Sequence, residues 1–286
     1  MNNKLAVLIS GSYRNFDETW KINQEILNNL DFPYEVFFHT WDTNPSMTSC
    51  VLETLYQNKF VFFLRKPFFS KFPEVDSKEV IIKKFSFYHV SVDKFHRESV
   101  CREFNLDASP TNFLLNSQIN SCGMYLGIEK LREALSEQDT FTHYLRVRTD
   151  FILDVSETHK IFDHDLVLFG QLLPTDEGLV GDQCFGGNLL RSGKTLSAYK
   201  TLKELTNSQD WFVNRVRVLG EDIVRQTLKP LRQNLDIVFL DGSGLIKRPD
   251  LEFYPFRKNP FYIKVILFHN LKLLIRKIIR RIKFWN

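Results

Sequence analysis

Two arginines and an aspartate occupy alternate positions in residues 144–150, Tyr-Leu-Arg-Val-Arg-Thr-Asp. If this segment is a strand, Arg146, Arg148 and Asp150 point to one side of a sheet. In an open α/β fold they reach the carboxyl edge of the sheet, where ligands bind. Guanidinium groups pair with phosphate oxygens, and a carboxylate can hold a divalent ion or a ribose hydroxyl. The segment predicts a diphosphate site, with an internal salt-bridge network as the alternative.

A second candidate phosphate contact follows the apolar run at residues 5–9. In the turn Gly11-Ser12-Tyr-Arg14, the glycine lets backbone amides approach a ligand, and Arg14 offers a forked donor to a phosphate. The alternative is a plain strand-to-helix turn. The turn is no Walker loop, and the sequence lacks the Gly-x-Gly-x-x-Gly fingerprint, which disfavours an NAD-dependent oxidoreductase.

Two later segments supply carboxylates. Residues 181–187, Gly-Asp-Gln-Cys-Phe-Gly-Gly, are expected to form a polar loop in which Asp182 and Gln183 line an acceptor pocket, or else a simple turn. Glu221 and Asp222 open a helical pattern. They either cap that helix or include the general base that removes a proton from an acceptor hydroxyl.

Alternating strand and helix patterns must position these groups. The alternation predicts a single α/β domain over residues 1–256, with residues 43–110 as a variable or inserted region. Expected strands are residues 5–9, 34–38, 143–147, 166–169 and 235–240. One expected helix begins at Asp17-Glu18, and further helices are expected over residues 112–135, 193–206, 209–218 and 221–229.

Charge and cysteine usage exclude several classes of protein. The net charge is +4, but residues 257–286 hold nine Lys and Arg and no acid, so residues 1–256 carry +4 − 9 = −5. An acidic body disfavours nucleic-acid binding. The four cysteines form no Cys-x-x-Cys pair, so reduced thiols are expected. The first residues lack the features of a signal peptide, and a cytoplasmic body is expected.

The basic tail, residues 257–286, has the pattern of an amphipathic helix. Its apolar residues share one face and its cations the other, which fits a helix lying in the headgroup layer of an anionic membrane at about 1 kcal/mol per cation. Packing against the body or a partner is the alternative. The predicted membrane contacts are Lys272, Arg276, Lys277, Arg280, Arg281 and Trp285.

Several motifs, taken in order, resemble a known family. They are residues 8–14, Phe37-Phe-His-Thr-Trp-Asp, the helix around residues 116–125, residues 144–150, Gly-Asp-Gln-Cys-Phe-Gly and Gly-Glu-Asp. This set is similar to the bacterial glycosyltransferases of lipopolysaccharide and capsule synthesis of the WavE-like kind. The resemblance covers most of residues 4–240 and implies a GT-A, Rossmann-like fold that binds a nucleotide-diphosphate sugar.

The resemblance also implies roles for individual residues. Gly11, Ser12 and Arg14 would contact the nucleotide, and Asp150 would hold the place of the last carboxylate of the Asp-x-Asp motif. Arg148 stands at the place of the first aspartate, so the arginines could replace Mg²⁺ or Mn²⁺ in neutralising the leaving diphosphate. Asp222 would be the base of an inverting displacement, with Glu221 as the close alternative and Asp182 as a further catalytic candidate.

The resulting expectation is a hexosyltransferase-type enzyme at the inner face of the cell membrane. It would transfer a sugar to a lipid-linked or polysaccharide acceptor in lipopolysaccharide, O-antigen or capsule synthesis. Two alternatives stay open from the residues alone. One is a nucleotidyl- or phosphotransferase, which shares phosphate-binding arginines, and the other is a non-catalytic, membrane-associated scaffold.

Overall fold

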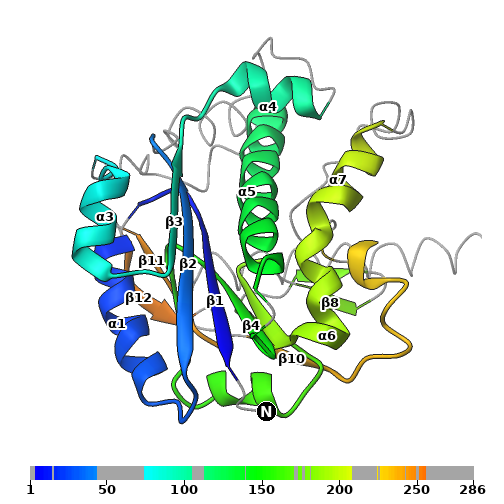
Figure 1. Ribbon diagram of the computed structural model, residues 1–286. Coiled ribbons are helices and arrows are strands. Elements are labelled where there is room, and N and C mark those ends of the chain that lie inside the picture. Colours follow the sequence, from blue (N-terminus) through cyan, green and yellow to red (C-terminus); the bar gives the residue numbers. More distant parts are fainter. Residues whose placement is uncertain are drawn as a thin grey trace, which may run out of the picture.

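The computed structural model describes residues 4–14, 16–43, 74–104, 113–138, 140–170, 173–175, 178–180, 182–207, 224, 226–241, 243–248 and 251–255. Within these residues the chain forms a mixed α/β structure around one seven-stranded sheet (Figure 1). The expected α/β fold is therefore confirmed at the level of its layers.

The central sheet has the strand order β10-β6-β9-β4-β1-β2-β3. Strands β1, β2, β3 and β4 are parallel neighbours, whereas β9 runs antiparallel to both β4 and β6. The strands are β1 (Leu5–Gly11), β2 (Tyr34–Trp41), β3 (His89–Asp93), β4 (His143–Arg148), β6 (Leu166–Gly170), β9 (Cys184–Asn188) and β10 (Ile237–Asp241).

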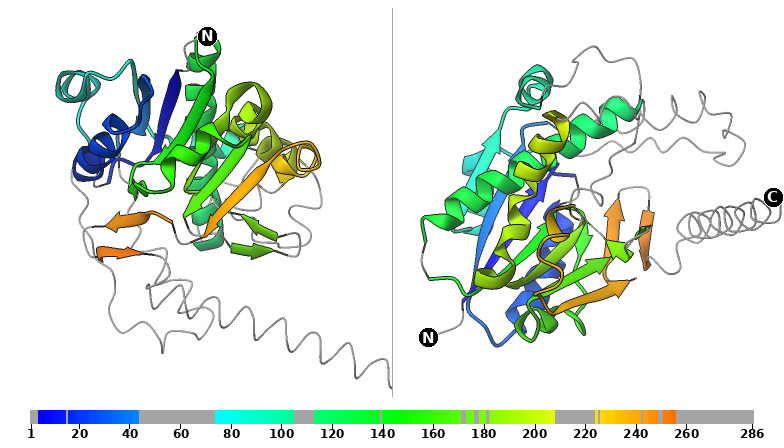
Figure 2. Two further views of the ribbon diagram at one scale, coloured as in Figure 1. Left: turned by 90° about the horizontal axis from the view of Figure 1, so that it is seen from below. Right: turned by 90° about the vertical axis from the view of Figure 1, so that its right-hand side faces the viewer.

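Helices cover both faces of this sheet (Figures 1 and 2). One face carries α4 (Arg97–Glu103), α5 (Phe113–Ser136), α6 (Leu189–Ser192), η3 (Gly193–Ser197) and α7 (Ala198–Asn207). The other face carries α1 (Phe16–Asn28), α3 (Lys78–Phe85) and η2 (Thr158–Phe162).

The period of two along each strand divides the core into two halves. Ala6 and Leu8 of β1 pack toward α5, while Leu5, Val7 and Ile9 pack toward α1. All five are at most 2% exposed, so β1 is buried on both faces, as its continuous apolar run predicts. The buried groups on the α1 face include Phe16, Trp20 and Leu27, which recur at helical spacing.

Two small sheets flank the main one. Strands β5 (Phe151–Ile152), β11 (Leu245–Arg248) and β12 (Leu251–Pro255) form a three-stranded sheet directly after the end of β4. Strands β7 (Leu173–Thr175) and β8 (Gly178–Val180) pair antiparallel as a two-stranded sheet. Because β5 begins one residue after Asp150, the turn at the end of β4 is anchored on both sides by sheet.

The structure corrects one expectation about residues 181–187. Only Asp182 and Gln183 of the described residues precede the strand, and Cys184–Asn188 forms β9 in the middle of the sheet. Glycine permits this because a Cβ on Gly186 would lie 2.5 Å from the carbonyl oxygen of Tyr144. The glycines that suggested a loop are needed for close approach to β4.

Other expectations agree with the structure. The long helix predicted over residues 112–135 is α5, and the helix predicted after Asp17-Glu18 is α1. The region 43–110, expected to be variable or inserted, is described only in part, and that part places β3 at the edge of the main sheet beside β2; whether the region is an insertion stays a prediction. Cys101, Cys122 and Cys184 are buried free thiols.

The basic tail lies outside the described residues, and so do the predicted membrane contacts Lys272, Arg276, Lys277, Arg280, Arg281 and Trp285. In the part of the chain that the structure describes, every helix is too short or too polar to cross a bilayer.

Candidate functional site

The strand order reverses between β1 and β4. From β1 the chain moves outward to β2 and β3, and it then returns to place β4 on the opposite side of β1. In open α/β sheets, ligands bind at the carboxyl ends of the two strands that flank such a reversal. The segments that leave β1 and β4 here are those that hold Arg14 and Asp150, so the topology brings the predicted phosphate contacts to one place.

Asp150 is shared by two arginines at this edge. The Nη1 of Arg14 donates to Oδ2 of Asp150, and the Nε of Arg148 donates to Oδ1 at 2.5 Å. The carboxylate is fully buried, whereas the Arg14 and Arg148 side chains are 16% and 15% exposed. Two cations on one anion leave a net charge of +1, held in a fixed geometry and partly open to solvent.

Hydrogen bonds join the two segments below this cluster. The Thr149 hydroxyl donates to the carbonyl of Ser12, and the Thr19 hydroxyl of α1 donates to the carbonyl of Thr149 at 2.6 Å. A Cβ on Gly11 would lie 3.2 Å from the Thr149 hydroxyl, and Gly11 has a φ of +145°. The turn after β1 therefore needs glycine to pass so close to the end of β4.

Arg14 adopts a left-handed backbone conformation, with a φ of +47°. Non-glycine residues visit this region at some energetic cost, and they remain there where surrounding contacts hold them. The ion pair with Asp150 is such a contact. The backbone and the ion pair together fix the direction of the guanidinium.

Asp182 and Gln183 lie beside the same edge because antiparallel β9 starts where β4 ends. The backbone N–H of Arg148 donates to the carbonyl of Gln183 at 3.0 Å. The Nη1 of Arg146 donates to the carbonyl of Asp182. The structure thus brings together all the described residues predicted for the site, although Arg146 contacts the Asp182 turn rather than Asp150.

Arg146 is fully buried, in contrast to its two neighbours. Burial lowers the pKa of its guanidinium, and the nearby Asp182 charge opposes that shift. The guanidinium carbon lies 5.8 Å from the centre of the Phe185 ring, a cation–π distance.

Sequence reasoning missed a second polar cluster on the α5 face. His39 pairs in register with Ser10, which in turn pairs with Arg148. The buried His39 Nε2 lies 3.0 Å from Oδ2 of Asp93, which also accepts from Lys130. Burial lowers the pKa of His39. The available signal was polar residues directly following apolar strand runs.

The described carboxylates do not fit a Mg²⁺ or Mn²⁺ site. Both oxygens of Asp150, the predicted metal ligand, accept from arginines. The described ranges also contain no group of three or more His, Cys, Asp or Glu side chains that could hold a metal ion. Glu221 and Asp222, the predicted bases, lie outside the described residues.

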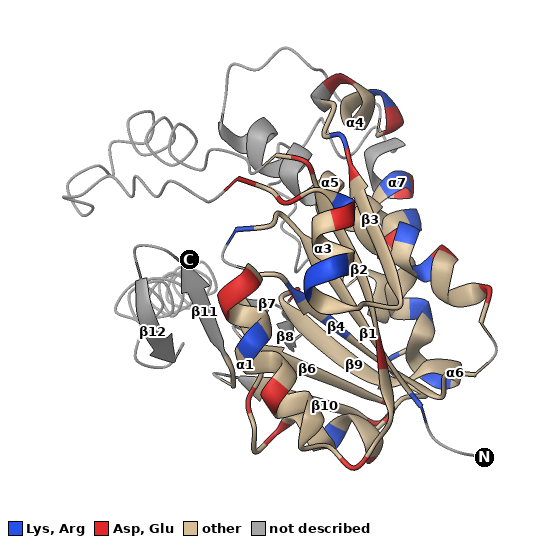
Figure 3. Cartoon of the chain, turned by 60° about the vertical axis from the view of Figure 1, so that its left-hand side comes forward, with Lys and Arg blue, Asp and Glu red and all other residues tan. Residues whose placement is uncertain are grey.

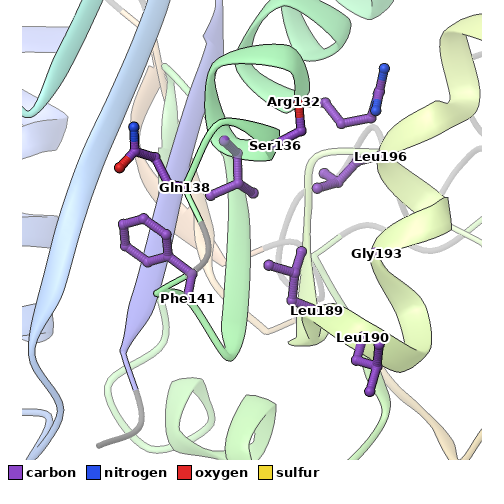
Figure 4. A pocket seen from close by; sticks show the side chains of 9 residues that line it. Arg132, Ser136, Gln138, Phe141, Leu189, Leu190, Gly193 and Leu196 are labelled. Atoms are coloured by element: carbon purple, nitrogen blue, oxygen red, sulfur yellow. The ribbon is translucent and has the colours of Figure 1, made fainter.

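Among the described residues, Lys, Arg, Asp and Glu elsewhere lie largely on helices and on the loops that connect the elements (Figure 3). A groove of about 420 Å³ lies at the opposite edge of the sheet, where Phe141 precedes β4 and Leu189 follows β9 (Figure 4). Leu135 and Leu196 also line it, and its arginine, Arg132, is paired twice with Glu129 at 2.7 and 2.8 Å. This apolar groove lacks the phosphate chemistry of the β1–β4 edge.

No protein-family model and no curated protein matches the chain. Among solved structures, the chain is similar to S. aureus TarS 1-349 at 10% identity and a TM-score of 0.30, over 88% of this chain and 59% of that one. It is also similar to the ligand-free glycosyltransferase domain from the YGT toxin, at 15% identity and a TM-score of 0.20, over 86% of this chain and 56% of that one. The chain thus spans less than two thirds of either structure.

Proposed function

We propose that the protein is a glycosyltransferase that binds a nucleotide-diphosphate sugar at the carboxyl edge of β1 and β4. The observation that carries the proposal is the pair of partly exposed arginines, Arg14 and Arg148, on one buried carboxylate at the reversal of strand order. A guanidinium carries five N–H donors in a planar fork that matches the geometry of phosphate oxygens.

The arrangement suits a leaving diphosphate. Donors that are fixed before the reaction stabilise developing negative charge without reorganising during it. In the proposed reaction, an acceptor hydroxyl attacks the anomeric carbon, and the bond from that carbon to the diphosphate oxygen breaks. The hydroxyl proton passes to a carboxylate, and the electron pair leaves with the nucleoside diphosphate beside Arg14 and Arg148.

We assign the proton-accepting role to Asp222, with Glu221 as the alternative, and we expect inversion at the anomeric carbon. Asp222→Asn should reduce turnover at least a hundredfold, because a general base contributes about 10² to 10⁴ in rate. Wild-type turnover in Asp222→Asn together with loss in Glu221→Gln would reverse the assignment. Wild-type turnover in both variants would refute the mechanism.

The basic tail supports an acceptor at a membrane. We propose that residues 257–286 hold the enzyme on the inner face of the cell membrane, where it adds sugar to a lipid-linked or polysaccharide acceptor of lipopolysaccharide, O-antigen or capsule synthesis. Deletion of residues 259–286 should weaken sedimentation with anionic liposomes and spare binding of the sugar nucleotide. Sedimentation equal to that of the full chain would argue against this role.

A thermal-shift screen tests the donor assignment. At least one class among the UDP-, GDP- and dTDP-sugars should stabilise the protein, and that class identifies the donor, since a ligand bound only to the folded state at 100 times its Kd adds about 2.7 kcal/mol. CMP-sugars, which carry a single phosphate, should stabilise it less. Stabilisation by nucleoside triphosphates alone would favour a nucleotidyl- or phosphotransferase, and no stabilisation by any nucleotide would favour a scaffold.

A further inference from the structure

Arg146 differs from the other two arginines of the edge in what it contacts. Its side chain is fully buried, packs over Phe185 and donates to the main-chain carbonyl of Asp182. Its Nε and Nη2 have no hydrogen-bond partner within the described residues. A buried cation is costly unless an opposite charge compensates it, and Asp182 provides the largest favourable charge interaction.

The Asp182–Gln183 turn is held from three sides. Arg146 binds the carbonyl of Asp182, and the backbone N–H of Arg148 binds the carbonyl of Gln183. The Gln183 side chain is 4% exposed, and its Oε1 would lie 2.7 Å from a Cβ on Gly170. These contacts join the turn that starts β9 to the end of β4 and to β6.

Formal charge differs along this edge. Arg14, Arg148 and Asp150 sum to +1 at the ends of β1 and β4. At the start of β9 Arg146 and Asp182 sum to zero, but Arg146 is fully buried whereas Asp182 is half-buried, so the carboxylate is the more exposed of the two. A carboxylate repels phosphate oxygens but accepts hydrogen bonds from hydroxyl groups. This distribution favours an orientation in which an extended substrate lies with its diphosphate toward β1 and its hydroxyls toward β9.

We propose that Arg146 is a positioning residue, which holds the turn so that the carboxylate of Asp182 accepts from sugar hydroxyls of the bound nucleotide sugar. The inference rests on the proposed function and deepens it, since Arg146 then acts on the sugar through Asp182 and does not bind the diphosphate. Asp182 becomes a residue that discriminates between sugars.

Calorimetric titrations of the full chain test this division of roles. The probes are the nucleotide sugar with the largest thermal shift and the matching nucleoside diphosphate. These are a UDP-sugar and UDP, a GDP-sugar and GDP, or a dTDP-sugar and dTDP. Arg146→Met and Asp182→Asn should each weaken binding of the nucleotide sugar about tenfold, because a hydrogen bond between the sugar and a charged group is lost. Both should change the affinity for the nucleoside diphosphate less than about twofold.

Further variants separate positioning from general damage. The double variant Arg146→Met/Asp182→Asn should be no weaker than the worse single variant, because the two residues act in series. Arg146→Lys is a smaller change that keeps the positive charge. Its affinity for the nucleotide sugar should lie between the affinities of Arg146→Met and wild type. Arg132→Met, at the opposite edge, should bind both probes as wild type does. Additive losses, or a loss of nucleoside diphosphate affinity in Arg146→Met as large as in Arg148→Met, would overturn the proposal.

Hydrogen exchange without ligand distinguishes failure of this inference from failure of the proposed function. Amides of Arg148 and of residues 182–185 should exchange at least tenfold faster in Arg146→Met and at the wild-type rate in Arg132→Met. If no nucleotide binds the wild type, the proposed function and the sugar contact both fail, while faster exchange still shows that Arg146 holds the turn. Unchanged exchange refutes the positioning role regardless of nucleotide binding.

Discussion

Arg14 and Asp150 form an ion pair across 136 positions of sequence, and the aspartate is fully buried. The pair links the turn after β1 to the turn after β4, and Arg148 approaches the same carboxylate from its other side. The structure thus shows a salt-bridge network, the alternative that the sequence left open, but with Arg14 rather than Arg146 as the second arginine on Asp150. The phosphate site at the same edge stays a prediction.

Asp150→Asn should destabilise the protein by about 3 kcal/mol, because loss of a buried charge leaves its ionic partners uncompensated. Urea unfolding of the full chain measures this difference. Asp236→Asn is the control. Asp236 is 62% exposed and pairs with His164, so its loss should change the free energy of unfolding by less than about 0.5 kcal/mol. Equal effects of the two substitutions would contradict the account of the Asp150 cluster.

Gly127→Ala should destabilise the protein by about 1–3 kcal/mol, although alanine favours a helix more than glycine does. A Cβ on Gly127 would lie 2.5 Å from Nδ1 of the buried His39 ring. Either α5 must move away from β2 or the His39 ring must shift. Thermal unfolding tests the change. In a His39→Ala background the same substitution should cost much less, and an undiminished cost there would show that the steric argument is wrong.

Acidification should destabilise the protein through His39. Burial lowers its pKa in the folded state, so the unfolded chain binds the proton more readily. The stabilising effect is complete above the unfolded pKa of about 6.5 and declines as the pH falls below it, by at most about 1.4 kcal/mol per pH unit. Urea unfolding at several pH values between 7 and 5 measures this slope.

His39→Gln is the matched variant for that measurement. The slope should become smaller but not vanish, because burial also lowers the pKa of His89 and His143. The pKa of Asp93 is held well below its usual range, first by its hydrogen bond to His39, and its contribution is lost only at lower pH. A slope in His39→Gln equal to that of wild type would rule out His39 as a source of the pH dependence.

Periodicity was enough to predict the layers of the fold and much of the edge. The apolar run of β1 and the helical spacing in α5 are local signals, and alternation of strands with helices placed Arg148 and Asp150 at a carboxyl edge. Local signals also placed Gly11 and Arg14 after β1. The reversal of strand order then made these two segments neighbours.

What sequence reasoning could not supply depends on long-range packing. Gly186 looked like part of a loop, and only the proximity of the Tyr144 carbonyl explains a glycine in a central strand. The separate environment of Arg146 was equally hidden. Spacing alone groups it with Arg148, whereas the antiparallel β9 covers it with Phe185 and offers it the Asp182 carbonyl.

The most direct test of the central claim is a calorimetric titration of wild type, Arg148→Met and Arg132→Met with the nucleoside diphosphate of the best-binding nucleotide sugar. Arg148→Met should bind the nucleoside diphosphate about thirtyfold more weakly, because losing a charged donor to phosphate costs roughly 2 kcal/mol of binding free energy. The affinity of Arg132→Met should match that of wild type. Equal affinity in all three proteins, or no binding to wild type, would contradict a diphosphate site between β1 and β4.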